Sequence, residues 1–227
     1  MQGFDLTGQT LVLFMMQLIA RFMRAFFALL YHPFAFTYDL VAAAVSFGRW
    51  KDWTNTVLPY IEGERVLELG FGPGHLQRIL LSRGLFAVGL DESRQMAGLT
   101  KRRLLKSGCT QINLSRGLAQ QLPFSSESFN TIIATFPSEY IFDPRTLAEV
   151  RRCLLNGGRL VVLPVAWPKS PLLAGLYKIT GESPSTIDPI IQRLKPIFEN
   201  TGFDVRLERL EERSSLLLII IATKADF

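Results

Sequence analysis

Three glycines at alternate positions carry the clearest chemical signal in the sequence. Gly70, Gly72 and Gly74 follow a short apolar run that contains Glu68, and His75 begins a helical pattern directly after them. Glycines at such a point allow a tight turn and let the backbone approach a ligand closely. The free N–H groups of the following helix can then meet an anionic group. We therefore expect a nucleotide-type ligand here.

The spacing of these glycines distinguishes between two kinds of nucleotide ligand. A dinucleotide-binding loop has the pattern G-x-G-x-x-G, whose third glycine would fall at position 75, where this chain has His75. The alternative pattern, acid-x-G-x-G-x-G, is met by Glu68, Gly70, Gly72 and Gly74. The loop thus favours a single nucleoside.

A second acidic residue follows at the end of the next apolar run. Asp91 closes the stretch FAVGLD, about twenty residues past the loop, where a carboxylate accepts hydrogen bonds from ribose hydroxyls. Alone, Asp91 could equally be a helix N-cap. Combined with the glycine loop, it favours a ribose contact. Met96, one turn further on, is placed either to pack against a purine or to fill the core.

Alternating strands and helices must position these residues. Apolar strand patterns occupy 65–70, 86–91, 111–117, 129–136 and 159–165, and helical patterns occupy 75–84, 93–108 and 144–158. A helix at 189–202 and two successive strands at 203–212 and 214–224 follow. The alternation predicts an α/β, Rossmann-like, seven-stranded and mostly parallel sheet that ends in an antiparallel hairpin. We expect an N-terminal helical extension over 1–60 and one domain over 61–227.

The extension is unusually apolar between residues 11 and 30. Gln17, Arg21 and Arg24 form a narrow polar stripe on this otherwise apolar helix, which suits a helix lying in a membrane interface. Packing within the protein or across a homodimer is the main alternative. Spanning a bilayer is marginal because two arginines lie in mid-segment. We expect peripheral membrane contact through residues 11–36, or a lid over the site.

Composition narrows the setting of the protein. The net charge of +5 favours anionic surfaces, and the two cysteines, which lack a CxxC motif, indicate a reduced protein in the cytoplasm. The apolar N-terminal helix adds the expectation of a peripheral position on the inner face of the membrane. With only two histidines, no metal site is expected. The basic run 101–106 and the pair Arg151 and Arg152 are interpreted as solvated helix faces, with Leu104 and Leu105 marking the buried side of the first, so no nucleic acid partner is expected.

Four segments in order make the sequence similar to the class I S-adenosylmethionine-dependent methyltransferases. These are VLELGFGPG, VGLDESRQM, RGLAQQLPFSSESFNTIIATF and EVRRCLLNGGRLVVL, and they cover about 65–165. The stretch FTYDLVAAAVSFGRWKDW resembles the branch that methylates ubiquinone and menaquinone precursors at carbon and phospholipids at nitrogen. The resemblance implies S-adenosyl-L-methionine as cofactor and methyl transfer as the activity.

The resemblance also assigns roles to individual residues. It implies that Glu68 meets the ammonium of the cofactor, that the backbone of Gly72–His75 holds its methionine end, and that Glu92 and Phe136 lie beside it. Relatives usually carry an Asp for the adenine amino group where this chain has Leu118. Adenine is then expected to contact the backbone near Ala119 and Gln120, or the Gln120 side chain.

Candidate catalytic residues lie in two places. Glu139 and Tyr140 follow the fourth strand, close to where the methyl group would emerge, and His32 lies in the N-terminal stretch. A base is needed only for some acceptors. His32 is equally consistent with a surface turn and Tyr140 with the core. The missing N-P-P-Y pattern argues against nucleobase acceptors.

The surroundings suggest the acceptor. The apolar helix, the aromatic stretch YHPFAF and the basic charge favour a lipophilic small molecule, a quinone precursor or an amino phospholipid, at or near a membrane. One alternative is a methyltransferase of soluble small molecules that uses the helix as a dimer interface. Another is a non-catalytic scaffold of the same fold.

Overall fold

The computed structural model describes residues 49–168, 187–213 and 215–225 of the chain. Residues 1–48 of the N-terminal extension predicted over 1–60 therefore lie outside the described residues. Among the described residues, none of the helices combines the length and the hydropathy that a membrane-spanning helix requires.

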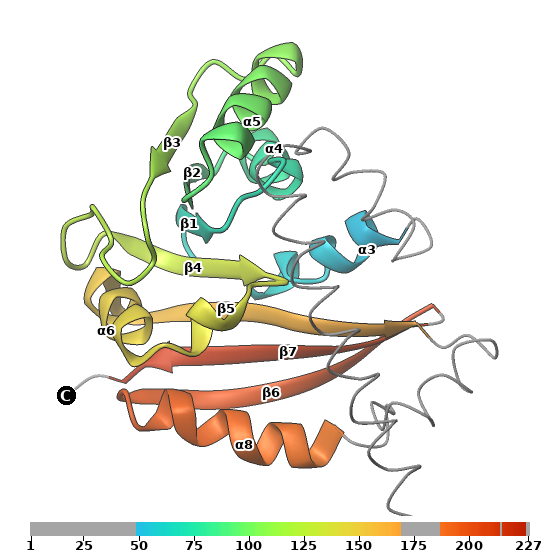
Figure 1. The fold of residues 1–227 in the computed structure, drawn as a ribbon, viewed down its shortest axis with the longest axis vertical. Helices are drawn as coiled ribbons and strands as arrows, with labels where there is room; N and C mark the ends of the chain where they lie inside the picture. The colour runs from blue at the N-terminus through green and yellow to red at the C-terminus, as the bar shows by residue number, and fades with distance from the viewer. Residues whose placement is uncertain (1–48, 169–186, 214, 226–227) are drawn as a thin grey trace, which may run out of the picture.

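Seven strands form one sheet in the order β3-β2-β1-β4-β5-β7-β6 (Figure 1). The strands are β1 (Arg65–Leu69), β2 (Phe86–Asp91), β3 (Asn113–Arg116), β4 (Phe129–Thr135), β5 (Leu154–Pro168), β6 (Phe203–Glu212) and β7 (Ser215–Lys224). The first five pair in parallel, and β7 pairs antiparallel to both β5 and β6. The prediction of a mostly parallel sheet with a terminal hairpin is confirmed.

Helices cover both faces of this sheet. They are α3 (Trp50–Asn55), η2 (Leu58–Tyr60), α4 (His75–Ser82), α5 (Arg94–Lys106), η3 (Glu139–Phe142), α6 (Pro144–Cys153) and α8 (Ile187–Glu199). Alternate strand residues point to opposite faces, so the core divides in two. One half joins α6 and α8 to the sheet, and the other joins α3 and α4 to it.

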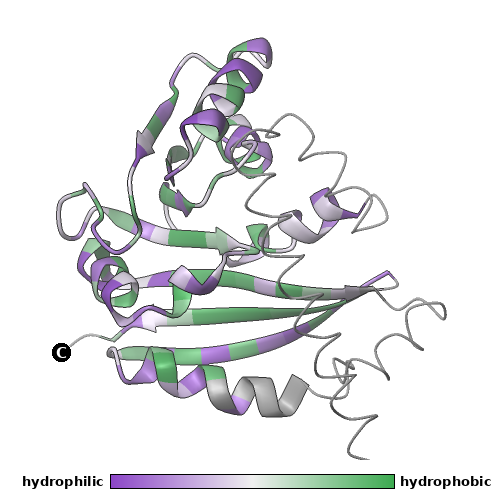
Figure 2. Cartoon of the chain, viewed as in Figure 1, coloured by the Kyte–Doolittle hydropathy of each residue, from purple (hydrophilic) through white to green (hydrophobic). Residues whose placement is uncertain are grey.

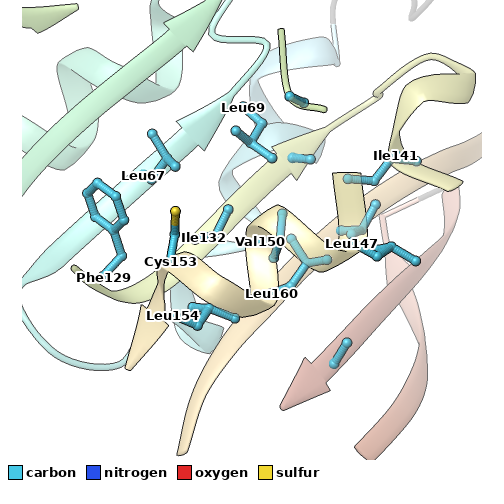
Figure 3. Packing of buried hydrophobic residues seen from close by; sticks show 14 of the residues in the cluster. Leu67, Leu69, Phe129, Ile132, Ile141, Leu147, Val150, Cys153, Leu154 and Leu160 are labelled. Carbon is cyan, nitrogen blue, oxygen red and sulfur yellow. The ribbon is translucent and has the colours of Figure 1, made fainter. Parts of the chain in front are cut away.

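The α6 half of the core shows why its helix lies where it does. Leu147, Val150 and Cys153 recur at helical spacing and are fully buried. Figure 3 shows them packed over Ile132 and Leu160, which point out of β4 and β5. This packing holds the carboxyl end of β4 in place beside the site described below.

The terminal hairpin closes the other edge of the sheet. In β7 the run Leu216–Ala222 is buried throughout, because both faces of the strand are covered. Figure 2 shows this strand as a nearly continuous apolar band, while the neighbouring edge strand β6 alternates with polar residues.

One predicted boundary is wrong. The sequence pattern extended the helix after Pro144 to Gly158, but α6 ends at Cys153 and β5 begins at Leu154. Leu154 is fully buried opposite Phe129, and its carbonyl accepts a 2.8 Å hydrogen bond from Lys224 Nζ. These contacts come from distant strands, so the Gly-Gly stop signal marks a bulge within β5 instead of the end of the helix.

Candidate functional site

A cavity of about 430 Å³ opens where the carboxyl ends of β1, β2 and β4 meet. Ligands of open α/β sheets bind at this position. Most of the residues predicted from the sequence line it: Glu68, Gly70, Gly72, His75, Asp91, Glu92, Ala119, Gln120, Phe136 and Tyr140.

Three of the predicted site residues that the structure describes do not line this cavity. Gly74 lies behind the loop against Thr100, and Met96 is fully buried in contact with Phe71, as the core-filling alternative expected. Glu139 is exposed at the start of η3. His32 falls outside the described residues.

The glycine loop has the backbone that its sequence predicts. Gly70 and Gly72 have φ values of +69° and +48°, in the left-handed region that favours glycine. A Cβ at Gly70 would lie 2.9 Å from the Tyr140 hydroxyl. That hydroxyl donates a 3.3 Å hydrogen bond to the Leu69 carbonyl, so Tyr140 from η3 rests directly on the loop.

Asp91 ties the loop to the second strand. Its Oδ2 accepts a hydrogen bond from Gly72 N–H and its Oδ1 accepts one from Ser93 N–H, both at 2.8 Å. Burial raises the pKa of Asp91 while these two backbone hydrogen bonds lower it. A carboxylate has about four acceptor sites, so both oxygens can still accept from a ligand.

Glu68 is the most perturbed acid of the site. It is 2% exposed, and among the described residues its Oε2 has no hydrogen-bond partner. Burial raises the pKa of Glu68 from 4.5 to about 8, a hydrogen bond with Gln77 lowers it, and the nearby Asp91 raises it. A buried, incompletely bonded carboxyl facing a cavity is suited to receive a cationic group.

The start of α4 offers the complementary charge. Its N-cap is Gly74, which supplies no side-chain hydrogen bond, so the first backbone N–H groups of the helix are not capped. His75 and Leu76 of this first turn line the cavity. An anionic group is favoured there by the N–H groups and by the helix dipole. Together with Glu68, this end of the cavity fits a zwitterionic amino acid.

The loop between β3 and β4 forms the opposite end of the cavity. Leu118 lies on its rim and is 55% exposed. The Gln120 side chain hydrogen-bonds Asp143, which contributes to the lowered pKa of that carboxyl. This engagement favours the backbone near Ala119 and Gln120, over the Gln120 side chain, as the purine contact.

The prediction that Arg151 and Arg152 form a solvated helix face is wrong, because both residues are half-buried and Arg151 Nε donates to the Gly202 carbonyl over 3.3 Å. Arg152 donates to the carbonyls of Leu122 (3.1 Å) and Phe124 (2.8 Å) and pairs with Glu149 at 2.8 Å. Glu149 Oε2 in turn accepts from Leu122 N–H over 2.8 Å. The Glu149–Arg152 ion pair therefore holds the loop that carries Ala119.

The basic run in α5 is also only partly solvated. Lys101, Arg102 and Lys106 are exposed as predicted, whereas Leu105, expected to be buried, is 56% exposed. Arg103 is half-buried and donates to the Pro73 carbonyl over 2.6 Å. Its partner is a carbonyl thirty residues away in sequence, which periodicity along one helix cannot reveal.

An aromatic wall, formed by Trp50 and Phe136, bounds the third side of the cavity. Their ring centroids are 4.2 Å apart, and Trp53 packs on the same Phe136 ring at 6.1 Å. Phe136 has φ +49°, an unfavourable conformation for a bulky residue, costing about 1–3 kcal/mol. Trp50 and Thr54 both line the cavity and were not predicted from the sequence. The only available signal was the aromatic spacing of the short helix before β1.

Comparisons with known proteins agree with this geometry. A family model described as "Methyltransferase domain" matches residues 66–158. Demethylmenaquinone methyltransferase of Clavibacter sepedonicus is 30% identical over 146 residues, covering 63% of this chain and 59% of the relative. The enzyme of that name from Thermotoga maritima is 34% identical over 152 residues, covering 64% of each. The chain thus spans less than two thirds of the length of either relative.

A solved structure extends the comparison to the fold. Magnesium protoporphyrin IX methyltransferase from Synechocystis PCC 6803, crystallised with bound SAH, superimposes with a TM-score of 0.54 at 18% identity, covering 77% of this chain and 83% of the other. The matched family region includes the glycine loop, Asp91 and the loop of Ala119. On this sequence evidence, residues 66–158 form a methyltransferase domain of the class I S-adenosylmethionine-dependent type, and the solved structure shares its fold.

Proposed function

We propose that this protein transfers a methyl group from S-adenosylmethionine to a lipophilic small molecule, a quinone precursor or an amino phospholipid, at or near a membrane surface. The observation that carries the proposal is a single cavity that joins a zwitterion-binding end, at Glu68 and the start of α4, to an aromatic wall at Trp50 and Phe136.

The described residues fit the cofactor. Glu68 would accept from the ammonium and the first turn of α4 would receive the carboxylate. Asp91 would accept from the ribose hydroxyls while it keeps its bond to Gly72. When bound, S-adenosylmethionine supplies an electrophilic methyl group, whose in-line transfer mainly requires alignment and exclusion of water.

The aromatic wall supports an apolar acceptor. Trp50, Phe136 and Pro137 present apolar surface to the cavity, while Thr54 and Ser138 provide a few hydroxyls. Sites for small molecules typically combine apolar walls with few polar groups. Relatives named demethylmenaquinone methyltransferase favour a quinone precursor within this class.

Tyr140 is the better placed of the two proposed proton acceptors. Tyr140 lines the cavity and its hydroxyl donates to the Leu69 carbonyl over 3.3 Å, whereas Glu139 is exposed and does not line the cavity. We propose Tyr140 as the group that orients or deprotonates the acceptor. A catalytic role for His32 remains a prediction.

Two measurements test the proposal. Calorimetry should detect S-adenosylhomocysteine binding at micromolar affinity or better, and absence of binding would contradict methyl transfer and favour the scaffold alternative. A radiolabelled-methyl assay should then compare demethylmenaquinol in detergent with phosphatidylethanolamine in liposomes. Trp50→Ala should raise KM for the accepted substrate and leave cofactor affinity unchanged, with exposed Lys51→Ala as the control.

The membrane component has its own test. Removing residues 1–30 should weaken sedimentation with anionic liposomes and leave cofactor binding largely intact. Loss of cofactor binding would instead indicate internal packing of that segment. A change from dimer to monomer after Phe22→Ser, Phe26→Ser and Phe27→Ser would favour the alternative with a soluble acceptor.

A further inference from the structure

Helix α5 contacts the glycine loop through two hydrogen bonds to consecutive carbonyls. The Thr100 hydroxyl donates to the Gly72 carbonyl over 2.7 Å, and Arg103 donates to the Pro73 carbonyl over 2.6 Å. Thr100 is fully buried and Arg103 is half-buried. Gly72 and Pro73 both line the cavity, so these bonds act on its wall from behind.

These contacts restrain the Gly72–Pro73 peptide, the part of the loop with the fewest backbone hydrogen bonds available to it. Pro73 has no N–H group, so the Gly72–Pro73 peptide can be fixed only through its carbonyl. The next N–H, that of Gly74, closes the turn by donating to the Phe71 carbonyl over 2.9 Å. Thr100 and Arg103 therefore complete the set of hydrogen bonds that orients the loop before α4.

The packing between α5 and the loop leaves no free space. Gly74 has φ +77°, and a Cβ there would lie 2.3 Å from Thr100 Cγ2. The loop therefore lies directly against the helix at Gly74, and the two hydrogen bonds oppose a shift away from it.

Arg103 also determines the state of His75. The same guanidinium nitrogen lies 3.0 Å from His75 Nε2. A guanidinium can only donate hydrogen bonds, so Nε2 accepts and the ring proton resides on Nδ1. His75 is the first residue of α4 and lines the cavity.

We infer that Thr100 and Arg103 are positioning residues for the amino-acid end of the bound nucleoside. Thr100 holds the Gly72 carbonyl, and Arg103 holds the Pro73 carbonyl and the Nδ1-protonated tautomer of His75. Together these contacts direct the first N–H groups of α4 into the cavity. This inference depends on the proposed function, since it takes S-adenosylmethionine as the ligand. Its distinguishing consequence is that the two residues affect the amino-acid end and not the adenosine end.

Two ligands and two matched variant pairs test this in the full chain. S-adenosylhomocysteine carries the amino-acid end, and 5′-methylthioadenosine lacks it. Thr100→Val and Arg103→Met should each weaken S-adenosylhomocysteine binding at least tenfold and change 5′-methylthioadenosine binding less than threefold. Thr100→Ser, which keeps the hydroxyl, and Arg102→Met, which removes an exposed charge one residue away, should stay within twofold for both ligands.

The outcomes separate the inference from the function on which it depends. Equal weakening for both ligands would indicate a general structural role and overturn the inference, as would unchanged binding of S-adenosylhomocysteine. If the unmodified chain binds neither ligand, the proposed function fails and the inference fails with it. Thermal unfolding of each variant identifies any that do not fold.

Nitrogen-15 NMR of the imidazole rings gives a readout that needs no ligand. The His75 signals, identified by their loss in His75→Gln, should show an unprotonated Nε2 in the unmodified chain. In Arg103→Met they should shift toward the Nε2-protonated tautomer, while Arg102→Met leaves them unchanged. The same tautomer in all three proteins would overturn the assigned role of Arg103.

Discussion

Gly72 N–H donates to Asp91 Oδ2 over 2.8 Å, so the carboxylate at the end of β2 holds the glycine loop that follows β1. The two parts of the predicted nucleoside site are thus bonded to each other. A change at Asp91 should disturb both the fold and the site, and the two effects can be measured separately.

Asp91→Ala removes the acceptor of two buried backbone N–H groups, at Gly72 and Ser93. Leaving a buried donor unsatisfied costs about 1–3 kcal/mol, so we expect a loss of that order in the free energy of unfolding, measured with urea. Asp91→Asn keeps one oxygen and should lose less. Calorimetry should show at least a hundredfold loss of S-adenosylhomocysteine affinity in both, and none in exposed Asp204→Ala. Unchanged affinity in Asp91→Ala would refute the ribose contact.

Glu68 should make the stability of the unliganded protein fall with pH. Its pKa is about 8 when folded and 4.5 ordinarily, so between these values the folded state binds more protons than the unfolded state. The free energy of unfolding therefore decreases as pH rises from about 5 to 8. Glu68→Gln removes this titratable group. The free energy of unfolding of the variant, measured with urea and compared with that of the unmodified protein, should therefore become relatively larger as pH rises across that range. A difference that is constant with pH would contradict the raised pKa.

Ligand binding should reverse the protonation of Glu68. A bound ammonium favours the carboxylate, so S-adenosylhomocysteine binding at pH 7 should release protons. Calorimetry in buffers with different ionisation enthalpies measures that number. It should approach zero in Glu68→Gln and with 5′-methylthioadenosine, which has no ammonium. Proton release that persists in Glu68→Gln would point to another group.

Alanine substitutions at two glycines with similar backbone angles can distinguish the cost of a left-handed backbone from the cost of a steric clash. Gly74 and Gly84 have φ +77° and +76°, but a Cβ at Gly84 meets nothing within 4 Å, whereas one at Gly74 would lie 2.3 Å from Thr100. Gly84→Ala should lower the free energy of unfolding by about 1–2 kcal/mol from the left-handed backbone alone. Gly74→Ala should lower it by about 1–3 kcal/mol more because it overpacks a buried site. Equal losses would show that the loop can move away from α5.

The Glu149–Arg152 pair should be coupled through Leu122. A double-mutant cycle with Glu149→Gln and Arg152→Met should give a coupling of about 1 kcal/mol or more in urea unfolding, since both side chains bond to the Leu122 backbone. The exposed pair Lys195–Glu199 in α8 is the reference and should give about 0.3–0.5 kcal/mol. Arg152→Met should also weaken 5′-methylthioadenosine binding. A coupling no larger than the reference would leave no special role for the pair.

The sequence by itself determined the sheet with its terminal hairpin, the glycine loop and the place of Asp91. These follow from local rules: the period of apolar residues, the left-handed backbone that only glycine adopts easily, and the common edge at which parallel strands end. The family resemblance followed from the same segments, because they are contiguous in the chain.

Tertiary structure decided what each long side chain does. Arg103 and Arg152 belong to helix faces that look solvated, yet each donates to carbonyls about thirty residues away. Trp50 at the start of α3 meets Phe136, the residue after β4, although the two are far apart in the sequence. Met96 is fully buried against Phe71 and does not line the cavity. Such partners depend on how distant segments are brought together in space, and periodicity within one segment contains no information about that distance.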